Sequence, residues 1–197
     1  MFDVPGSVKS LRRYYKDKLT VPSADGLVAE LAGESDRAAI ILLTALIESA
    51  LAYRIGSSLS FRPNEAQFDH AFRFEGPLGT FSARIEIAFL FGLIDETTRT
   101  QLDLVREMRN ACAHSKYEMH FGVQELANVA KRLFRPLGVA HPIDHSRKSL
   151  REAFTIEAMI IFYVLVEGSR EQGIASFNSD LNDAGLKMPS RDKPPQP

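Results

Sequence analysis

Residues that can bind phosphate and transfer protons occur together near the middle of the chain, in the run Arg109-Asn110-Ala111-Cys112-Ala113-His114. An imidazole gains and loses its proton near neutral pH, which makes histidine a common general acid or base. A guanidinium offers a planar pair of donors to phosphate oxygens. Arg109 and His114 therefore have the chemistry needed to act on a phosphodiester without a metal ion or other cofactor.

Residues 101–115 are predicted to form an amphipathic helix that presents these groups. At 3.6 residues per turn, Arg106, Asn110 and His114 follow one another on one polar face, which we call the polar ridge. Arg109 lies at the border of the ridge, and its long side chain can bend towards it. The polar face comprises Asp103, Arg106, Glu107, Asn110 and His114, and the apolar face comprises Leu104, Val105, Met108, Ala111 and Cys112.

The spacing of these residues alone has three interpretations. A polar helix face is most often simply solvated, and an arginine and a histidine five residues apart often occur by chance. The ridge can also serve as a contact between two copies of the chain. The third interpretation is a phosphodiester site, with Arg109 as the phosphate-binding group and His114 as the acid or base.

Arg37 and Glu48 are supporting candidates on an earlier helix, expected from Ser35 to about Arg54. They are eleven residues apart, which returns nearly to the same helix face. Glu48 lies in an apolar stretch and needs a partner if it is buried. We expect it either to pair with Arg109 and orient that side chain, or to reach water at the edge of the helix.

A zinc site and a nucleophilic cysteine are the weaker alternatives. His141, Asp144 and His145 have suitable ligand atoms, but Pro142 disfavours a helical arrangement and no further ligands cluster nearby. Cys112 lies on the apolar helix face, which predicts a buried hydrophobic residue. We therefore expect no metal and no cofactor.

The composition fits a cytoplasmic globular protein. The chain has 197 residues, 45% of them hydrophobic, and a formal net charge of −1, so nucleic acid could bind only at a local patch. One such patch is the basic start from Lys9 to Lys18, although a solvated helix is the commoner outcome. A single cysteine excludes a disulfide within the chain. The longest apolar run, Ala38 to Tyr53, contains Thr44 and Glu48 and favours a buried helix over a membrane span.

Helical periodicity dominates the rest of the chain, and strand signals are nearly absent. We predict an all-α, single-domain bundle of about six to eight helices. Helices are expected near residues 7–18, 24–32, 35–54, 65–72, 80–91, 95–114, 122–134 and 147–171. Residues 1–34 are expected to pack on a core of residues 35–175, and residues 176–197 to form a disordered tail.

Three blocks of the sequence resemble the mannitol operon repressor family. They are Gly76 to Ile94, Leu104 to Ser115, and Ser35 to Ala38 followed by Leu46-Ile47-Glu48. Together they cover roughly residues 35–115 in the family's order and spacing. The resemblance implies an all-helical regulator of transcription, without a helix-turn-helix, that acts through a protein or RNA partner and does not bind DNA directly.

The pattern Arg109-Asn110 followed by His114 is also similar to that of HEPN domains. These are helical bundles, often homodimers, and some are metal-independent ribonucleases. This resemblance implies that Arg109 binds phosphate, His114 acts as acid or base and Asn110 assists. The sequence thus favours a regulatory, repressor-like protein, with an endoribonuclease as the alternative and a simple interaction module as a third possibility.

Overall fold

The computed structural model describes residues 24–60, 64–134 and 147–185, and these residues form helices and connecting loops without a strand. The predicted all-α fold is confirmed. The helices are α2 (Ala24–Ala32), α3 (Asp36–Ser57), α4 (Glu65–Phe72), α5 (Phe81–Leu90), α6 (Glu96–His114), α7 (Gln124–Leu133), α8 (Arg147–Glu167) and α9 (Arg170–Asp183). The helix expected near residues 7–18 and residues 135–146 lie outside the described part of the chain.

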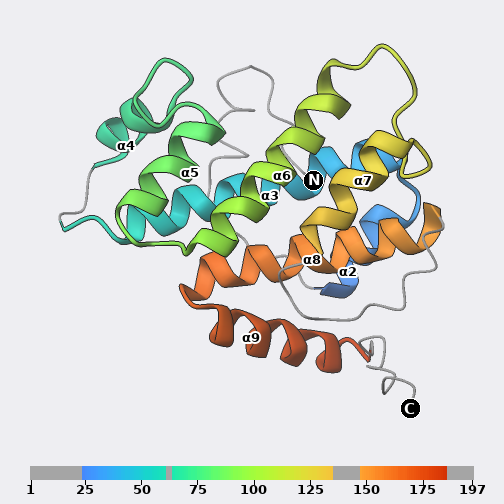
Figure 1. The fold of residues 1–197 in the computed structure, drawn as a ribbon. Coiled ribbons are helices and arrows are strands. Elements are labelled where there is room, and N and C mark those ends of the chain that lie inside the picture. Colours follow the sequence, from blue (N-terminus) through green and yellow to red (C-terminus); the bar gives the residue numbers. More distant parts are fainter. Residues whose placement is uncertain (1–23, 61–63, 135–146, 186–197) are drawn as a thin grey trace, which may run out of the picture.

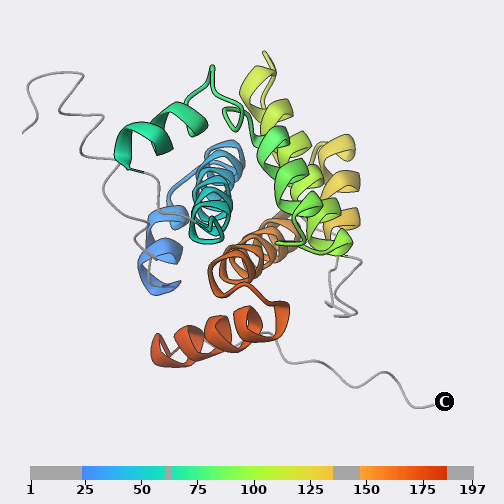
Figure 2. The same cartoon turned by 90° about the vertical axis from the view of Figure 1, so that its left-hand side faces the viewer.

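Helices α3 and α8 occupy the centre of the bundle (Figures 1 and 2). Helix α3 packs against α5, α6 and α8, and α8 also packs against α7 and α9. Helix α6 lies between α5 and α7 and contacts both. The ridge-bearing helix is therefore supported along one side by the middle of the bundle.

The core explains why α3 and α8 are central. Every residue from Ala158 to Leu165 on α8 is buried, so this part of the helix is enclosed on all sides. Ile40, Ile47 and Leu51 of α3 are also fully buried. Burying such side chains contributes about 1.5–3 kcal/mol each, which makes this pair of helices the main source of stability.

Side chains cap the starts of three helices. Those of Ser35, Thr80 and Asp95 accept hydrogen bonds from backbone N–H groups three residues later, at 3.2, 3.2 and 2.7 Å. Gly92 follows the end of α5 with a φ of +66°, a conformation that favours glycine. The helix expected to end near Arg54 continues to Ser57, because Gly56 is accommodated within α3.

The last part of the described chain differs from the prediction. One helix was expected over residues 147–171, but α8 ends at Glu167 and Gly168, with a φ of +83°, turns the chain back into α9. Residues 176–183 belong to α9 and not to a disordered tail. Contacts that hold α9 on α8 include the buried ring of Phe177, which lies 5.8 Å from the ring of Tyr163, and the hydrogen bond that the hydroxyl of Tyr163 donates to the carboxylate of Asp180. Residues 186–197 lie outside the described part of the chain.

Helix α3 is the single described helix that is long and apolar enough to cross a membrane by composition. Buried residues make up 44% of its most apolar 18-residue window. A core helix of a globular protein passes the same test, and α3 packs against three other helices.

Candidate functional site

Helix α6 presents the polar ridge as predicted. Its buried residues include Leu104, Val105, Met108 and Cys112, while Asn110 is half-buried and His114 is exposed in the last turn. Ala111 is the exception on the apolar face: it is exposed, because it lies next to Glu107 at the edge of that face. The buried face of α6 is thus narrower than the apolar face predicted from the sequence.

Arg109 is bent towards the ridge by its neighbour. Consecutive helical residues point about 100° apart, so Arg109 and Asn110 start on different faces. The guanidinium Nη1 of Arg109 donates to the side-chain oxygen of Asn110 at 3.1 Å, which draws the charge towards the side of the helix where His114 follows one turn later. Arg109 forms no ion pair with a described carboxylate. Its positive charge is therefore available to an anion outside the chain.

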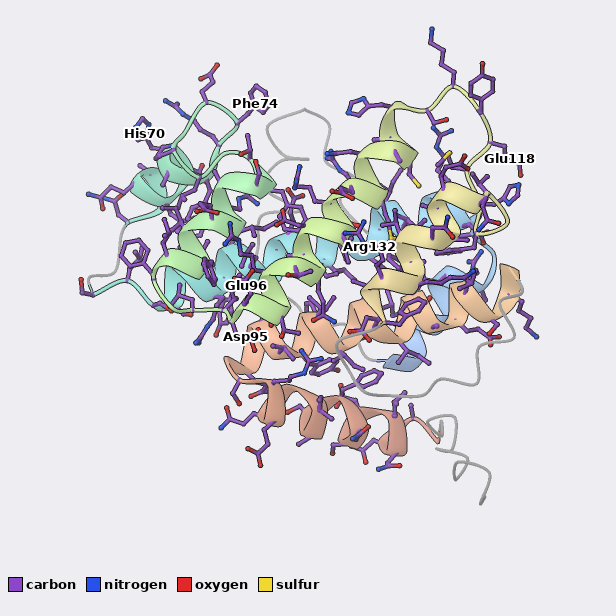
Figure 3. All side chains as sticks on the ribbon, in the orientation of Figure 1. His70, Phe74, Asp95, Glu96, Glu118 and Arg132 are labelled. Atoms are coloured by element: carbon purple, nitrogen blue, oxygen red, sulfur yellow. The ribbon has the colours of Figure 1, made fainter. Side chains whose placement is uncertain are left out.

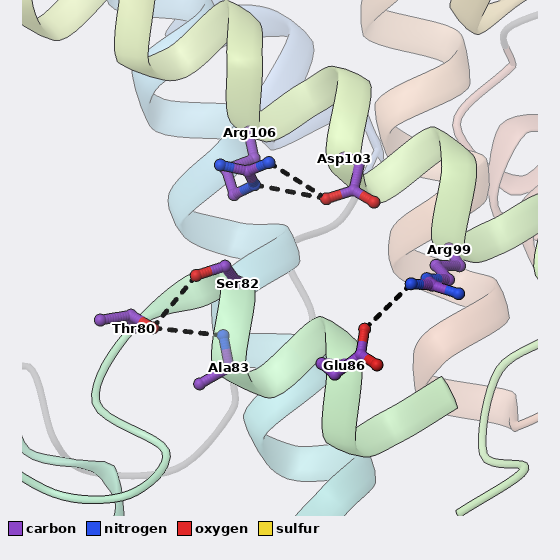
Figure 4. A network of polar contacts seen from close by, with 7 residues as sticks. All are labelled: Thr80, Ser82, Ala83, Glu86, Arg99, Asp103 and Arg106. Atoms are coloured by element: carbon purple, nitrogen blue, oxygen red, sulfur yellow. Dashed lines mark hydrogen bonds and ion pairs between the residues drawn. The ribbon is translucent and has the colours of Figure 1, made fainter. Parts of the chain in front are cut away.

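Arg106, by contrast, is engaged within the helix. Its guanidinium contacts a carboxylate oxygen of Asp103 at 3.3 Å (Figure 4). Nearer the amino end of α6, Arg99 pairs with Glu86 of α5 at 3.0 Å and so ties the two helices together (Figure 4). These pairs partly neutralise the first half of the polar face, and the side chains of the face that form no ion pair with a described residue lie towards its carboxyl end.

The expected pair between Glu48 and Arg109 is not formed. Glu48 is half-buried, and the cation that its charge influences is Arg84 of α5. Burial lowers the pKa of Arg84, and the carboxylate of Glu48 opposes that change. Glu48 lies at the edge of α3, so it is spared full desolvation and does not require Arg109 as a partner.

Arg37 supports α6 in a way that its spacing from Glu48 does not reveal. Its Nε donates to the carbonyl oxygen of Cys112 at 2.6 Å, and its Nη2 donates to that of Ser115 at 2.5 Å. The last carbonyl groups of a helix have no partner within the helix, so these bonds satisfy two of them on either side of His114. Arg37 therefore fixes the end of α6 that carries the imidazole.

Cys112 is fully buried, as predicted for a hydrophobic residue. Burial raises the pKa of its thiol, and the nearby charge of Arg37 opposes this effect. A buried thiol that stays protonated is a poor nucleophile.

A second anchor was not predicted. The carboxylate of Asp36 is only 2% exposed; it accepts from the backbone N–H of Phe121 at 3.0 Å and from Arg151 at 2.9 Å. Arg151 also donates to the carbonyl oxygen of Leu31 at 2.7 Å. Phe121 lies 85 positions from Asp36 in the sequence, and Arg151 lies 115 positions from it. No local spacing in the sequence could therefore reveal these contacts.

Residues 76–80 form the tight connection into α5. A side chain on Gly76 or Gly79 would overlap backbone oxygens of residues 70–74. The guanidinium of Arg84 donates to the carbonyl oxygens of Leu78 at 2.7 Å and Phe72 at 3.1 Å. These contacts give residues 76–80 a structural role at the start of α5.

Comparison with models of known protein families, with curated proteins and with solved structures finds no match to this chain.

A buried polar cluster was also missed. Glu157 of α8 is fully buried and accepts from Gln101 of α6 at 2.5 Å, and Arg170 of α9 donates to Gln101 at 3.4 Å. Gln101 lies one turn before Val105 on the apolar face of α6, and this position was a usable sign that it is buried. The cluster joins three helices of the core, away from the exposed ridge.

The described residues contain no group of three or more His, Cys, Asp or Glu side chains suited to a metal ion. The weaker zinc candidate formed by His141, Asp144 and His145 falls outside the described residues.

Proposed function

We propose that this protein is a regulator that acts by binding RNA at the polar ridge of α6. The observation that carries the proposal is the hydrogen bond from Arg109 to Asn110, which draws the guanidinium towards the helix face that holds His114. A guanidinium without a carboxylate partner among the described residues, on the same helix end as an exposed imidazole, is suited to a phosphate group. The resemblance to the mannitol operon repressor family supports a regulatory role, as part of transcriptional control.

The negative charge at the amino end of α6 disfavours direct recognition of DNA by this helix. Helix α6 follows α5 after the short connection of residues 91–95, which contains Gly92. A recognition helix enters the major groove with its amino-terminal residues, but α6 begins with Asp95 and Glu96 (Figure 3). These carboxylates would repel the phosphates that line the groove. The ridge therefore fits an RNA partner better than a promoter.

An endoribonuclease is the second candidate, because His114 is exposed and has no hydrogen-bond partner among the described residues. In this reaction the imidazole takes the proton of a ribose 2′-hydroxyl, whose oxygen attacks the adjacent phosphorus. The bond from phosphorus to the 5′-oxygen breaks, and that oxygen takes a proton from water, while the imidazolium returns its own proton to the solvent. Arg109 stabilises the charge on the phosphorane, and the products are a 2′,3′-cyclic phosphate and a 5′-hydroxyl.

One experiment tests both candidates. Fluorescently labelled RNA is titrated with the wild type and with Arg109→Ala and His114→Ala in the presence of EDTA, and the same samples are run on a denaturing gel. Arg132→Ala is the matched control, since Arg132 is an exposed arginine on α7 (Figure 3). We expect Arg109→Ala to weaken binding about tenfold, the loss of one charge-assisted contact, and the control to change it less than about twofold.

The gel separates the two functions. A regulator leaves the RNA intact, whereas a ribonuclease cleaves it and loses cleavage in both site variants. Wild-type affinity weaker than about 100 µM, the weak end of non-specific binding, would contradict both candidates.

A further inference from the structure

We infer that the loop of residues 115–122, between α6 and α7, binds an unpaired RNA base on the ring of Tyr117. This inference rests on the proposed RNA binding by the ridge and names the form of RNA that the site accepts. Its basis is a loop that is anchored at both ends and yet presents an aromatic side chain to solvent.

Buried or half-buried charges hold both ends of the loop. At its start, Arg37 bonds to the carbonyl oxygen of Ser115. At its end, the buried carboxylate of Asp36 accepts from the N–H of Phe121, whose ring is 1% exposed and lies 5.5 Å from the ring of Phe154. Hydrogen bonds to charged groups are stronger than those between neutral groups, so these contacts hold the backbone of the loop in place at both ends.

The backbone at Tyr117 is fixed locally as well. The hydroxyl of Ser115 accepts from the N–H of Tyr117 at 3.0 Å and donates to its carbonyl oxygen at 3.2 Å. The side chain of Tyr117 is nevertheless 83% exposed. A ring on an ordered backbone loses little conformational entropy when a flat ligand stacks on it, which favours binding.

The surrounding charges favour a nucleic acid as the ligand. Lys116 is exposed and has no ion-pair partner among the described residues, and His114 is exposed three positions before Tyr117. Three residues span at most about 11 Å, so a base on Tyr117 and the phosphate at the ridge can belong to neighbouring nucleotides. Glu118 is exposed beside them and opposes anion binding, so stacking must supply part of the affinity (Figure 3).

Stacking on a protein ring requires a base whose face is free. Within a duplex the faces are covered by neighbouring bases, whereas single strands and loops expose them. The structure therefore assigns single-stranded RNA to this site.

The test compares a single-stranded RNA of about 12 nucleotides with the same strand annealed to its complement. Tyr117→Ala is expected to weaken binding of the single strand about 5- to 30-fold, the effect of losing one base–aromatic stack. Tyr117→Phe keeps the ring and is expected to bind like the wild type. Phe74→Ala is the control, because Phe74 is 86% exposed on a different loop (Figure 3).

Each other outcome overturns the inference in a recognisable way. If Arg109→Ala weakens binding but Tyr117→Ala does not, the ridge binds RNA without this loop and the proposed function stands. Equal affinity for duplex and single strand excludes stacking on Tyr117. A change of mass in sedimentation of Tyr117→Ala, with unchanged RNA affinity, identifies the loop as a contact between copies. No RNA binding by the wild type overturns both this inference and the proposed function.

Discussion

At the carboxyl end of α6, Arg37 donates to the carbonyl oxygens of Cys112 and Ser115. Sequence reasoning placed Arg37 among the supporting residues because it shares a helix face with Glu48. The residues to which it donates lie 75 and 78 positions away in the sequence. Its residue type and helix face were predictable, but its partners depend on how α3 and α6 pack.

Arg37→Ala is expected to lower the free energy of unfolding by about 1–3 kcal/mol, because two carbonyl groups lose a charged donor. Urea unfolding measures this loss, and Arg132→Ala should change stability by less than about 0.5 kcal/mol. Amide exchange should also become faster in residues 112–121. Unchanged exchange there would show that Arg37 does not fix the end of α6.

At the scale of the elements, the caps and the amphipathic pattern were sufficient for most of the fold. The helices predicted near residues 65–72 and 95–114 match α4 and α6 closely, because Asn64 and Asp95 act as N-caps. Helix α9 was missed, because its few apolar residues, such as Phe177, give a weak pattern by themselves. These residues are buried because α9 packs against α8, and the sequence does not show which face of α8 is left open for another helix.

The connection from α4 to α5 shows which glycines are required. Gly76→Ala and Gly79→Ala should each lower the free energy of unfolding by at least about 2 kcal/mol, since the new methyl group would overlap backbone oxygens. Gly33→Ala is the control, because its methyl group would meet nothing within 4 Å. Urea unfolding of the three variants checks the order, and equal stabilities would show that the turn adjusts freely.

At the scale of the whole molecule, the cluster of Glu157, Gln101 and Arg170 ties α8, α6 and α9 together. Sequence reasoning identified Glu48 as the carboxylate in need of a partner, yet Glu157 is the one that is fully buried. Glu48 lies within an apolar stretch and Glu157 directly precedes one, so only the packing of α8 on all sides distinguishes them. Burial raises the pKa of Glu157 to about 7, although Arg170 and the hydrogen bond from Gln101 oppose the change.

This raised pKa makes stability depend on pH. Between pH 4.5 and 7 the folded protein holds a proton on Glu157 that the unfolded chain releases, so the contribution of this group to stability is fully present below pH 4.5 and is lost as the pH rises through 7. The contribution of this group is about 3 kcal/mol. Glu157→Gln removes it, and the stability of the variant relative to the wild type should increase from pH 5 to pH 8.

Urea unfolding at several pH values measures this difference. Glu152→Gln is the control, because Glu152 is an exposed glutamate on the same helix. If the wild type and Glu157→Gln show the same dependence on pH, the carboxyl of Glu157 is already ionised in the folded protein at low pH.

The reactivity of the single cysteine, Cys112, can be used to follow opening of the helix end that carries the site. Cys112 lies within the last turns of α6, its side chain is sealed from solvent and its carbonyl group is held by Arg37. A thiol reagent can reach the sulfur only when this part of the helix opens, so the rate of labelling counts those openings. RNA held at the neighbouring ridge would slow that rate, and occupancy of the site could then be followed chemically in the unmodified chain.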